Sequence, residues 1–137
     1  MKITLSKEET LEIIHNALCN GLGWIGGYGI SVSNTKAEYE EAKKSLSEDD
    51  KSEFQKKHNM GFCYEDVLTK ILKDGKALKF YDSEQEEDVQ FTLEEATERL
   101  QDESVAQHVL DMMNENDDAI TADCILQTAM YGEIVFG

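Results

Sequence analysis

The sequence lacks proline altogether, has no long hydrophobic run, and contains far fewer basic than acidic residues. We attach no functional meaning to the missing proline. A membrane-spanning helix needs roughly 18 or more consecutive apolar residues, so the sequence predicts no membrane span. The first residues, Met1 to Lys7, also lack the apolar centre of a signal peptide. We therefore expect a cytoplasmic protein that does not contact membranes.

Cysteine and histidine are also scarce. The three cysteines, Cys19, Cys63 and Cys124, are odd in number and widely spaced, which favours reduced thiols over disulfides. His15 and Cys19 have the spacing of half a zinc site, but no second pair of ligands accompanies them in the sequence. We interpret them as a histidine at the edge of the core and a buried cysteine, and we expect no metal.

Motifs that would indicate catalysis are missing as well. The sequence contains no G-x-S-x-G, no phosphate-binding G-x-x-x-x-G-K-[ST] and no H-E-x-x-H. Residues 21–26 match G-x-G-x-x-G, but they follow a predicted helix, whereas the dinucleotide-binding fingerprint follows a strand. We therefore expect neither an enzyme nor a bound cofactor.

The charge balance is the most unusual total. The chain has 29 acidic against 13 basic residues, a net charge of −16 at pH 7. Such a chain repels phosphate backbones and anionic membranes, which disfavours direct nucleic-acid binding. A basic surface on another protein is the natural electrostatic partner. The alternative is an acidic protein whose charge serves solubility alone.

Chain length and hydrophobic content predict one folded domain over residues 1–137. The fold class that we predict is α+β: a small antiparallel sheet packed by five to seven helices. The sheet consists of a hairpin at about 77–92 and a further strand over 24–32, in which aromatic and apolar residues alternate with glycine and serine. Residues 34–60 are polar and predict a peripheral helical segment, with a helix start at Ser47.

The C-terminal helix is predicted to be central. Asp117 and Asp118 are residue types that begin helices, and Gly132 follows the last helical position. Between them lie two apolar arcs, and a helix that is apolar on two sides is a buried one. These arcs comprise Ala119, Ala122, Ile125, Leu126, Ala129 and Met130, and then Ile120, Cys124 and Tyr131.

Four further helices are predicted from their starts and apolar stripes. Ser6 with Glu9 forms a capping box for the first, which Asn20-Gly21 should end. A second stripe begins at Tyr64, and Thr92 with Glu95 caps a third. A helix over 105–113 places His108 within its apolar face, where we expect a core histidine with a hydrogen-bond partner.

Two groups of residues are candidates for partner binding. One is the acidic hairpin tip, where four carboxylates gather without an evident role in the core: Glu84, Glu86, Glu87 and Asp88. The other is an aromatic face made by Trp24 and Tyr28 beside the glycines of the predicted strand. The structural alternatives are a turn that keeps the sheet edge soluble and two core aromatics.

The C-terminal residues 118–137 carry the pattern A-D-x-x-(L/V)-Q-x-A-x-x-G-E-(I/V)-V-(F/Y)-G. This segment resembles a group of small acidic proteins of phages and mobile elements. The resemblance extends to the Ser6 helix, the stretch near Trp24 and the hairpin, which is about half the chain and excludes 34–60. It implies a phage or prophage accessory gene. No activity is assigned to that group, so no functional residue is carried over.

These features predict a non-catalytic phage protein that binds and inhibits a host factor, for example one of antiviral defence, through an acidic surface. A module that sequesters a small molecule or nucleotide signal through Trp24 and Tyr28 is the alternative. A third option is a structural or regulatory phage protein that acts by oligomerisation, for instance as a homodimer.

Overall fold

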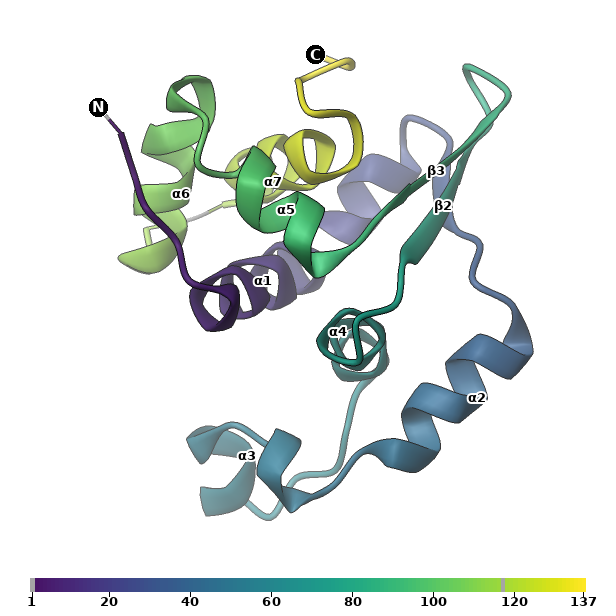
Figure 1. The fold of residues 1–137 in the computed structure, drawn as a ribbon. Helices are drawn as coiled ribbons and strands as arrows, with labels where there is room; N and C mark the ends of the chain where they lie inside the picture. The colour runs from purple at the N-terminus through teal and green to yellow at the C-terminus, as the bar shows by residue number, and fades with distance from the viewer. Residues whose placement is uncertain (1, 117) are drawn as a thin grey trace.

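Helices α1 and α7 form the centre of the structure. The computed structural model describes residues 2–116 and 118–137. In it, α1 (Lys7–Gly26) and α7 (Ala119–Tyr131) pack side by side, and the other elements surround them (Figure 1). The described residues form seven α-helices, two short 3₁₀ helices and a three-stranded antiparallel sheet. The predicted α+β fold with a central C-terminal helix is therefore confirmed.

Helix α7 begins and ends where the sequence predicts. The Asp118 side chain accepts a hydrogen bond from the N–H of Thr121, and Gly132 ends the helix with φ 77°; Asp117 lies outside the described residues. The first apolar arc is buried from Ala122 to Met130. The second arc is buried less, because Ile120 is 56% exposed.

Helix α1 is longer than predicted. Its capping box of Ser6 and Glu9 is present, but the helix continues past Asn20-Gly21 to Gly26, so the predicted end is wrong. Gly21 lies at the contact with α7: a Cβ there would stand 3.0 Å from both Ala122 Cβ and Leu126 Cδ1. This glycine therefore lets two helices approach closely and does not terminate one of them.

The extension of α1 shortens the strand that was expected to follow it. Trp24 belongs to the last turn of α1, and only Ile30–Val32 form a strand, β1. The prediction of a strand over 24–32 is thus wrong for its first six residues. In the intervening turn Gly29 has φ 89°, and a Cβ on it would lie 2.3 Å from Ser83 Oγ, so glycine is required there.

The hairpin forms as predicted. Strands β2 (Leu78–Asp82) and β3 (Glu87–Phe91) are antiparallel, and β1 adds to the other side of β2, giving the order β1-β2-β3. Phe80 and Phe91 are fully buried and their rings stack with centroids 6.1 Å apart. The sheet contacts α1 through β1, α4 (Tyr64–Lys73) through β2 and α7 through β3, so one core joins it to the helices.

Residues 34–60 lie at the periphery, below α1 and α4 in the view of Figure 1. They form α2 (Lys36–Ser45), a 3₁₀ turn (Glu48–Asp50) and α3 (Glu53–Lys57). Ala42 is their only buried residue. The helix predicted to run on from Ser47 breaks because the Ser52 side chain accepts from Gln55 N and starts α3 anew.

Helices α4 (Tyr64–Lys73), α5 (Leu93–Arg99) and α6 (Ala106–Met113, after a 3₁₀ turn Glu103–Val105) complete the fold. His108 on α6 departs from expectation, because its buried Nδ1 has no hydrogen-bond partner within the described chain. None of the helices in the described part of the chain is long and apolar enough to cross a membrane.

Candidate functional site

The hairpin turn is built around the fully buried carboxylate of Asp82. This carboxylate accepts hydrogen bonds from the N–H groups of Glu84 and Gln85, both at 3.0 Å, and from Gln85 Nε2 at 2.8 Å. The Tyr131 hydroxyl of α7 donates a fourth, at 2.5 Å. Burial opposes ionisation of Asp82, but these donors outweigh it and lower the pKa of the carboxyl.

A second set of bonds ties the turn to the segment after α1. The N–H and the Oγ of Ser83 both donate to the carbonyl oxygen of Gly29, at 3.0 and 2.9 Å. The turn is therefore held from two sides, by α7 through Tyr131 and by Gly29. Such a support gives the tip a fixed shape.

The structure brings together the four predicted tip carboxylates, and all four are exposed. None makes an ion pair with any residue in the described ranges. Glu86 also has φ 52°, in the left-handed region that favours glycine. The residues of this acidic tip are Glu84, Glu86, Glu87 and Asp88.

The charge of the whole chain is distributed unevenly. Residues 80–137 contain 16 Asp and Glu against a single Arg, whereas residues 1–79 contain 13 against 12 Lys. The hairpin tip and α5–α7 lie on one side of α1, and α2–α4 lie on the other (Figure 1). Nearly all of the net negative charge therefore belongs to the side that carries the acidic tip.

Trp24 and Tyr28 also lie together, but not on a strand. Trp24 Nε1 donates to the Tyr28 hydroxyl at 3.1 Å, and that hydroxyl donates to Asp123 Oδ2 at 2.7 Å. The Tyr28 ring stacks on Phe136 with centroids 5.1 Å apart. Trp24 is 47% exposed, so it is not a core aromatic. We expected a face of glycines beside these rings because the sequence predicted a strand over 24–32. Since residues 24–29 are not a strand, that face does not form.

The same network explains the C-terminal sequence pattern. Gln127 Nε2 donates to Asp123 Oδ1 at 2.8 Å and to the Phe136 carbonyl at 2.9 Å. Gln127 Oε1 accepts from the N–H groups of Val135 and Phe136, both at 2.7 Å. Asp123 and Gln127, the one acidic and one amide side chain of the pattern within α7, thus fasten the tail to the helix. Their role here is structural.

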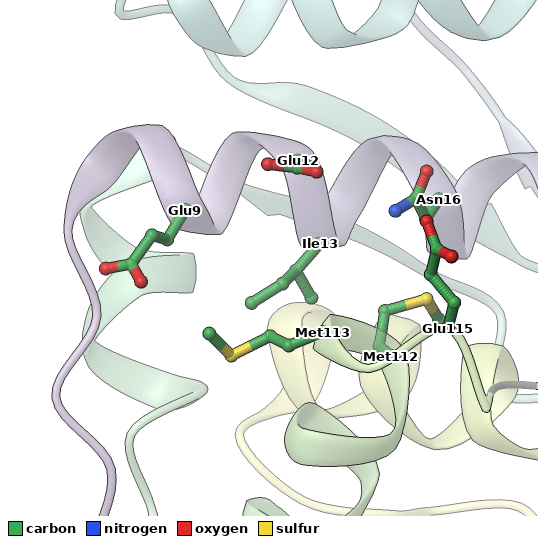
Figure 2. Close-up of a pocket in the computed structure, with 7 residues that line it drawn as sticks. All are labelled: Glu9, Glu12, Ile13, Asn16, Met112, Met113 and Glu115. Carbon is green, nitrogen blue, oxygen red and sulfur yellow. The ribbon is translucent and has the colours of Figure 1, made fainter.

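A groove between α1 and α6 is too small and too acidic for a nucleotide. Its volume is about 150 Å³, against roughly 300–1,000 Å³ for pockets that hold drug-sized ligands. Figure 2 shows three carboxylates around Ile13 and the methionines of α6, and their charge would repel a phosphate. These carboxylates belong to Glu9, Glu12 and Glu115.

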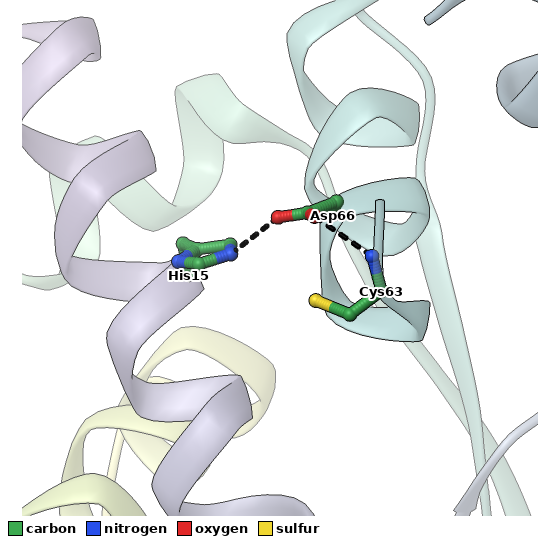
Figure 3. Close-up of side chains that lie close together, drawn as sticks. All are labelled: His15, Cys63 and Asp66. Carbon is green, nitrogen blue, oxygen red and sulfur yellow. Dashed lines mark hydrogen bonds and ion pairs between the residues drawn. The ribbon is translucent and has the colours of Figure 1, made fainter. Parts of the chain in front are cut away.

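A cluster that the sequence did not predict lies between α1 and α4. His15 Nε2 is 2.8 Å from Asp66 Oδ1, and the Cys63 N–H donates to Asp66 Oδ2 at 2.9 Å (Figure 3). Cys19 Sγ lies 4.0 Å from the same His15 nitrogen. The interpretation of His15 and Cys19 as a pair without partners is therefore wrong, and Cys19 is exposed, not buried.

Sequence reasoning missed Cys63 and Asp66 because Cys63 lies 44 positions after Cys19 in the chain. The signal that could have found them is local: Cys63 precedes α4 and Asp66 is its third residue, the positions of a capping box. A residue that caps one helix can face the neighbouring helix as well.

The thiols of this cluster are poor nucleophiles. Cys19 is exposed as a residue, but neighbouring atoms partly shield its thiol from water, and this desolvation, with added repulsion from Glu65, Cys63 and Asp66, raises the pKa of Cys19 to about 11. Partial desolvation of the thiol likewise raises the pKa of Cys63. Because the thiolate is the reactive form, neither cysteine is activated for catalysis at neutral pH. His15 also presents one nitrogen to both Asp66 and Cys19, which is not the relay geometry of a catalytic triad.

Comparison with known proteins adds no residue roles. A scan against family models, a search of curated proteins and a search of solved structures each found no match.

Proposed function

We propose that this is a non-catalytic binding protein that engages a basic surface on another protein through its acidic tip. The observation that carries the proposal is the support of the tip: a buried carboxylate, Asp82, and the Gly29 carbonyl hold the turn that displays four carboxylates. We propose further that the partner is a host factor, which the protein inhibits in the host cytoplasm. The resemblance of residues 118–137 to small acidic phage proteins supports this proposal.

The conformation of Glu86 supports a binding role over a solubility role. A left-handed residue other than glycine costs on the order of 1 kcal/mol, so glycine would make the turn more stable. Any exposed position nearby would supply solubility equally well without that cost. A carboxylate kept at a strained position favours a function that needs it there.

The charge distribution supports the same side of the molecule as the contact surface. A basic partner is attracted to residues 80–137, where acidic residues outnumber basic ones by 16 to one. Such attraction mainly accelerates association and weakens with added salt.

Homodimerisation stays a prediction, and light scattering at several protein concentrations tests it.

The test compares the wild-type protein with a variant in which the tip is neutral. Both are used as baits in host lysate, and the captured protein is then measured by surface plasmon resonance at several salt concentrations. The neutral tip should associate at least tenfold more slowly, with a shallower salt dependence, while its melting temperature is unchanged or slightly higher. Its changes are Glu84→Gln, Glu86→Gln, Glu87→Gln and Asp88→Asn.

A matched control removes four exposed charges from the same side but outside the tip. It should associate clearly faster than the neutral tip, because only general attraction is reduced. Equal slowing in both variants would contradict a tip-specific contact and leave only long-range attraction. Unchanged association in the neutral tip would assign the tip to solubility. The control changes are Glu94→Gln, Glu98→Gln, Glu103→Gln and Glu133→Gln.

Glu86→Gly separates stability from binding within one residue. It should raise the free energy of unfolding by about 1 kcal/mol, because the strain at φ 52° is released. It should also weaken the captured complex, because one tip carboxylate is lost. A more stable variant with unchanged affinity would show that this carboxylate does not contact the partner.

A further inference from the structure

We propose that His15, Cys19, Cys63 and Asp66 bind a divalent transition-metal ion, for which Zn²⁺ is the best fit, between α1 and α4. Ligand atoms of His15, Cys63 and Asp66 all lie within 4.8 Å of one another. Cys19 adds a fourth ligand atom 4.0 Å from His15 Nε2. The site goes beyond the proposed function, because it lies across α1 from the acidic tip and needs no partner protein.

The spacing of the ligand atoms suits tetrahedral coordination. Bonds of roughly 2.0–2.3 Å from zinc to nitrogen, oxygen and sulfur place neighbouring ligand atoms about 3.3–3.8 Å apart. The observed separations of 2.8 Å between His15 Nε2 and Asp66 Oδ1 and 4.0 Å between His15 Nε2 and Cys19 Sγ lie on either side of that range. The ligand atoms of His15, Cys63 and Asp66 therefore already lie together, and the side chain of Cys19 has to turn toward them to supply the fourth bond.

The kinds of ligand also point to zinc. Two sulfurs, one imidazole nitrogen and one carboxylate oxygen form a set that Zn²⁺ accepts, whereas Mg²⁺ and Ca²⁺ require oxygen ligands. Figure 3 shows the ring of His15 pointing from α1 to Asp66, with the sulfur of Cys63 on the side that faces α1. The ligands come from two helices, so an ion would join α1 to α4.

The carboxylate of Asp66 is held in the orientation that such a site needs. Its Oδ2 accepts from Cys63 N at 2.9 Å and from Gln55 Nε2 at 2.8 Å, which leaves Oδ1 toward His15. Metal-binding carboxylates are commonly fixed by such hydrogen bonds. Asp66 is 8% exposed, so a cation beside it would neutralise a charge that is largely removed from water.

Binding is a ligand exchange without oxidation or reduction. The hydrated ion releases water, the S–H bonds of Cys19 and Cys63 break, and two protons pass to solvent. The ion then bonds to the two sulfurs, to Asp66 Oδ1 and to His15 Nε2, whose imidazole carries its proton on Nδ1. The ion can enter from the open groove that His15 and Asp66 line together with Gln55, Asp50 and Lys70.

The test titrates the reduced, chelator-treated protein with Co²⁺, which absorbs strongly when bound by thiolate in a tetrahedral site. We expect stoichiometric uptake with a thiolate-to-cobalt band, displacement by Zn²⁺, and a higher melting temperature with either ion. Cys19→Ser and Cys63→Ser should each reduce the band and weaken binding at least tenfold. The double variant should lose the band completely.

Cys124→Ser is the matched control, because it removes the third thiol, on α7, and should leave the titration unchanged. Circular dichroism of each serine variant checks folding, and the exposure of Cys19 and Cys63 favours intact folds. A band that survives in the Cys19/Cys63 double variant would overturn the proposal, as would the absence of any cobalt–thiolate band in the wild type. A Cys19–Cys63 disulfide in air, with no metal uptake after reduction, would also overturn it.

Discussion

Asp82 and Asp66 are buried aspartates with the same local task and different surroundings. Each accepts backbone hydrogen bonds at a turn: Asp82 accepts two in the hairpin, and Asp66 accepts one at the start of α4. Asp82 also accepts hydrogen bonds from the side chains of Gln85 and Tyr131, so protein donors reach both of its oxygens. Asp66 Oδ1 meets only His15 within the described chain, beside two thiols.

The difference separates a carboxylate that serves folding from one that a ligand can still use. A buried carboxylate whose oxygens are all occupied by protein donors has no remaining position for an ion. A carboxylate fixed on one side and open toward soft ligands on the other retains one. Four predictions test this distinction, beginning with the largest expected effect.

Asp82→Asn should cause the largest loss of stability. An amide in place of the carboxylate keeps the shape but turns an NH₂ group toward donors, which leaves buried groups unpaired. We expect the free energy of unfolding to fall by about 3 kcal/mol, measured by urea denaturation.

Asp66→Asn provides the comparison, with a smaller expected loss of about 1–2 kcal/mol in the presence of a chelator. It should, in addition, abolish the stabilisation by Zn²⁺, which Asp82→Asn should retain. The distinction between the two carboxylates would be wrong if both variants lost the same free energy of unfolding in chelator and were stabilised equally by zinc.

Tyr131→Phe tests the contact between Asp82 and α7 alone. Removing the hydroxyl takes one donor from the buried carboxylate, and we expect a loss of about 1–2 kcal/mol in thermal or urea unfolding. Tyr81→Phe is the control, because Tyr81 precedes Asp82 on the same strand and is 39% exposed. A loss in Tyr81→Phe as large as that in Tyr131→Phe would show that the hydroxyl bond to Asp82 is not the cause.

The smallest effect concerns pH. The pKa values of Asp82 and Asp66 are both lowered, because hydrogen-bond donors outweigh burial. Their contribution to stability is therefore present above the unfolded pKa of about 3.9 and is lost as pH falls through the lower folded values. Urea denaturation from about pH 5 to pH 3 should show declining stability, and less of a decline in Asp82→Asn. An identical pH dependence in that variant would contradict the assignment.

Most secondary structure could be predicted because its signals are local. The caps at Ser6, Thr92 and Asp118 and the alternation around Phe80 and Phe91 act within a few residues of the chain. The end of α1 could not be predicted, because Gly21 is explained by a contact with Ala122 of α7, which lies 101 positions away. A glycine that ends a helix and one that admits another helix look alike in sequence.

The candidate sites divide in the same way. The acidic tip was predictable, since its four carboxylates fall within five positions of one turn. The burial of Asp82 beneath them was not, because it depends on Tyr131. The cluster of His15 with Cys63 and Asp66 could not be predicted either, because only the packing of α4 against α1 brings its two halves together.

The concentration of negative charge on one side of α1 gives the molecule a permanent electric dipole. At low ionic strength, where the Debye length is roughly 10 Å or more, such a dipole turns the molecule before contact. A positively charged resin or a positively charged coating on glass would therefore bind the protein through α5–α7 and the hairpin tip. In that orientation α4 and the groove beside His15 would face the solvent, where dissolved ions and reagents could still reach them.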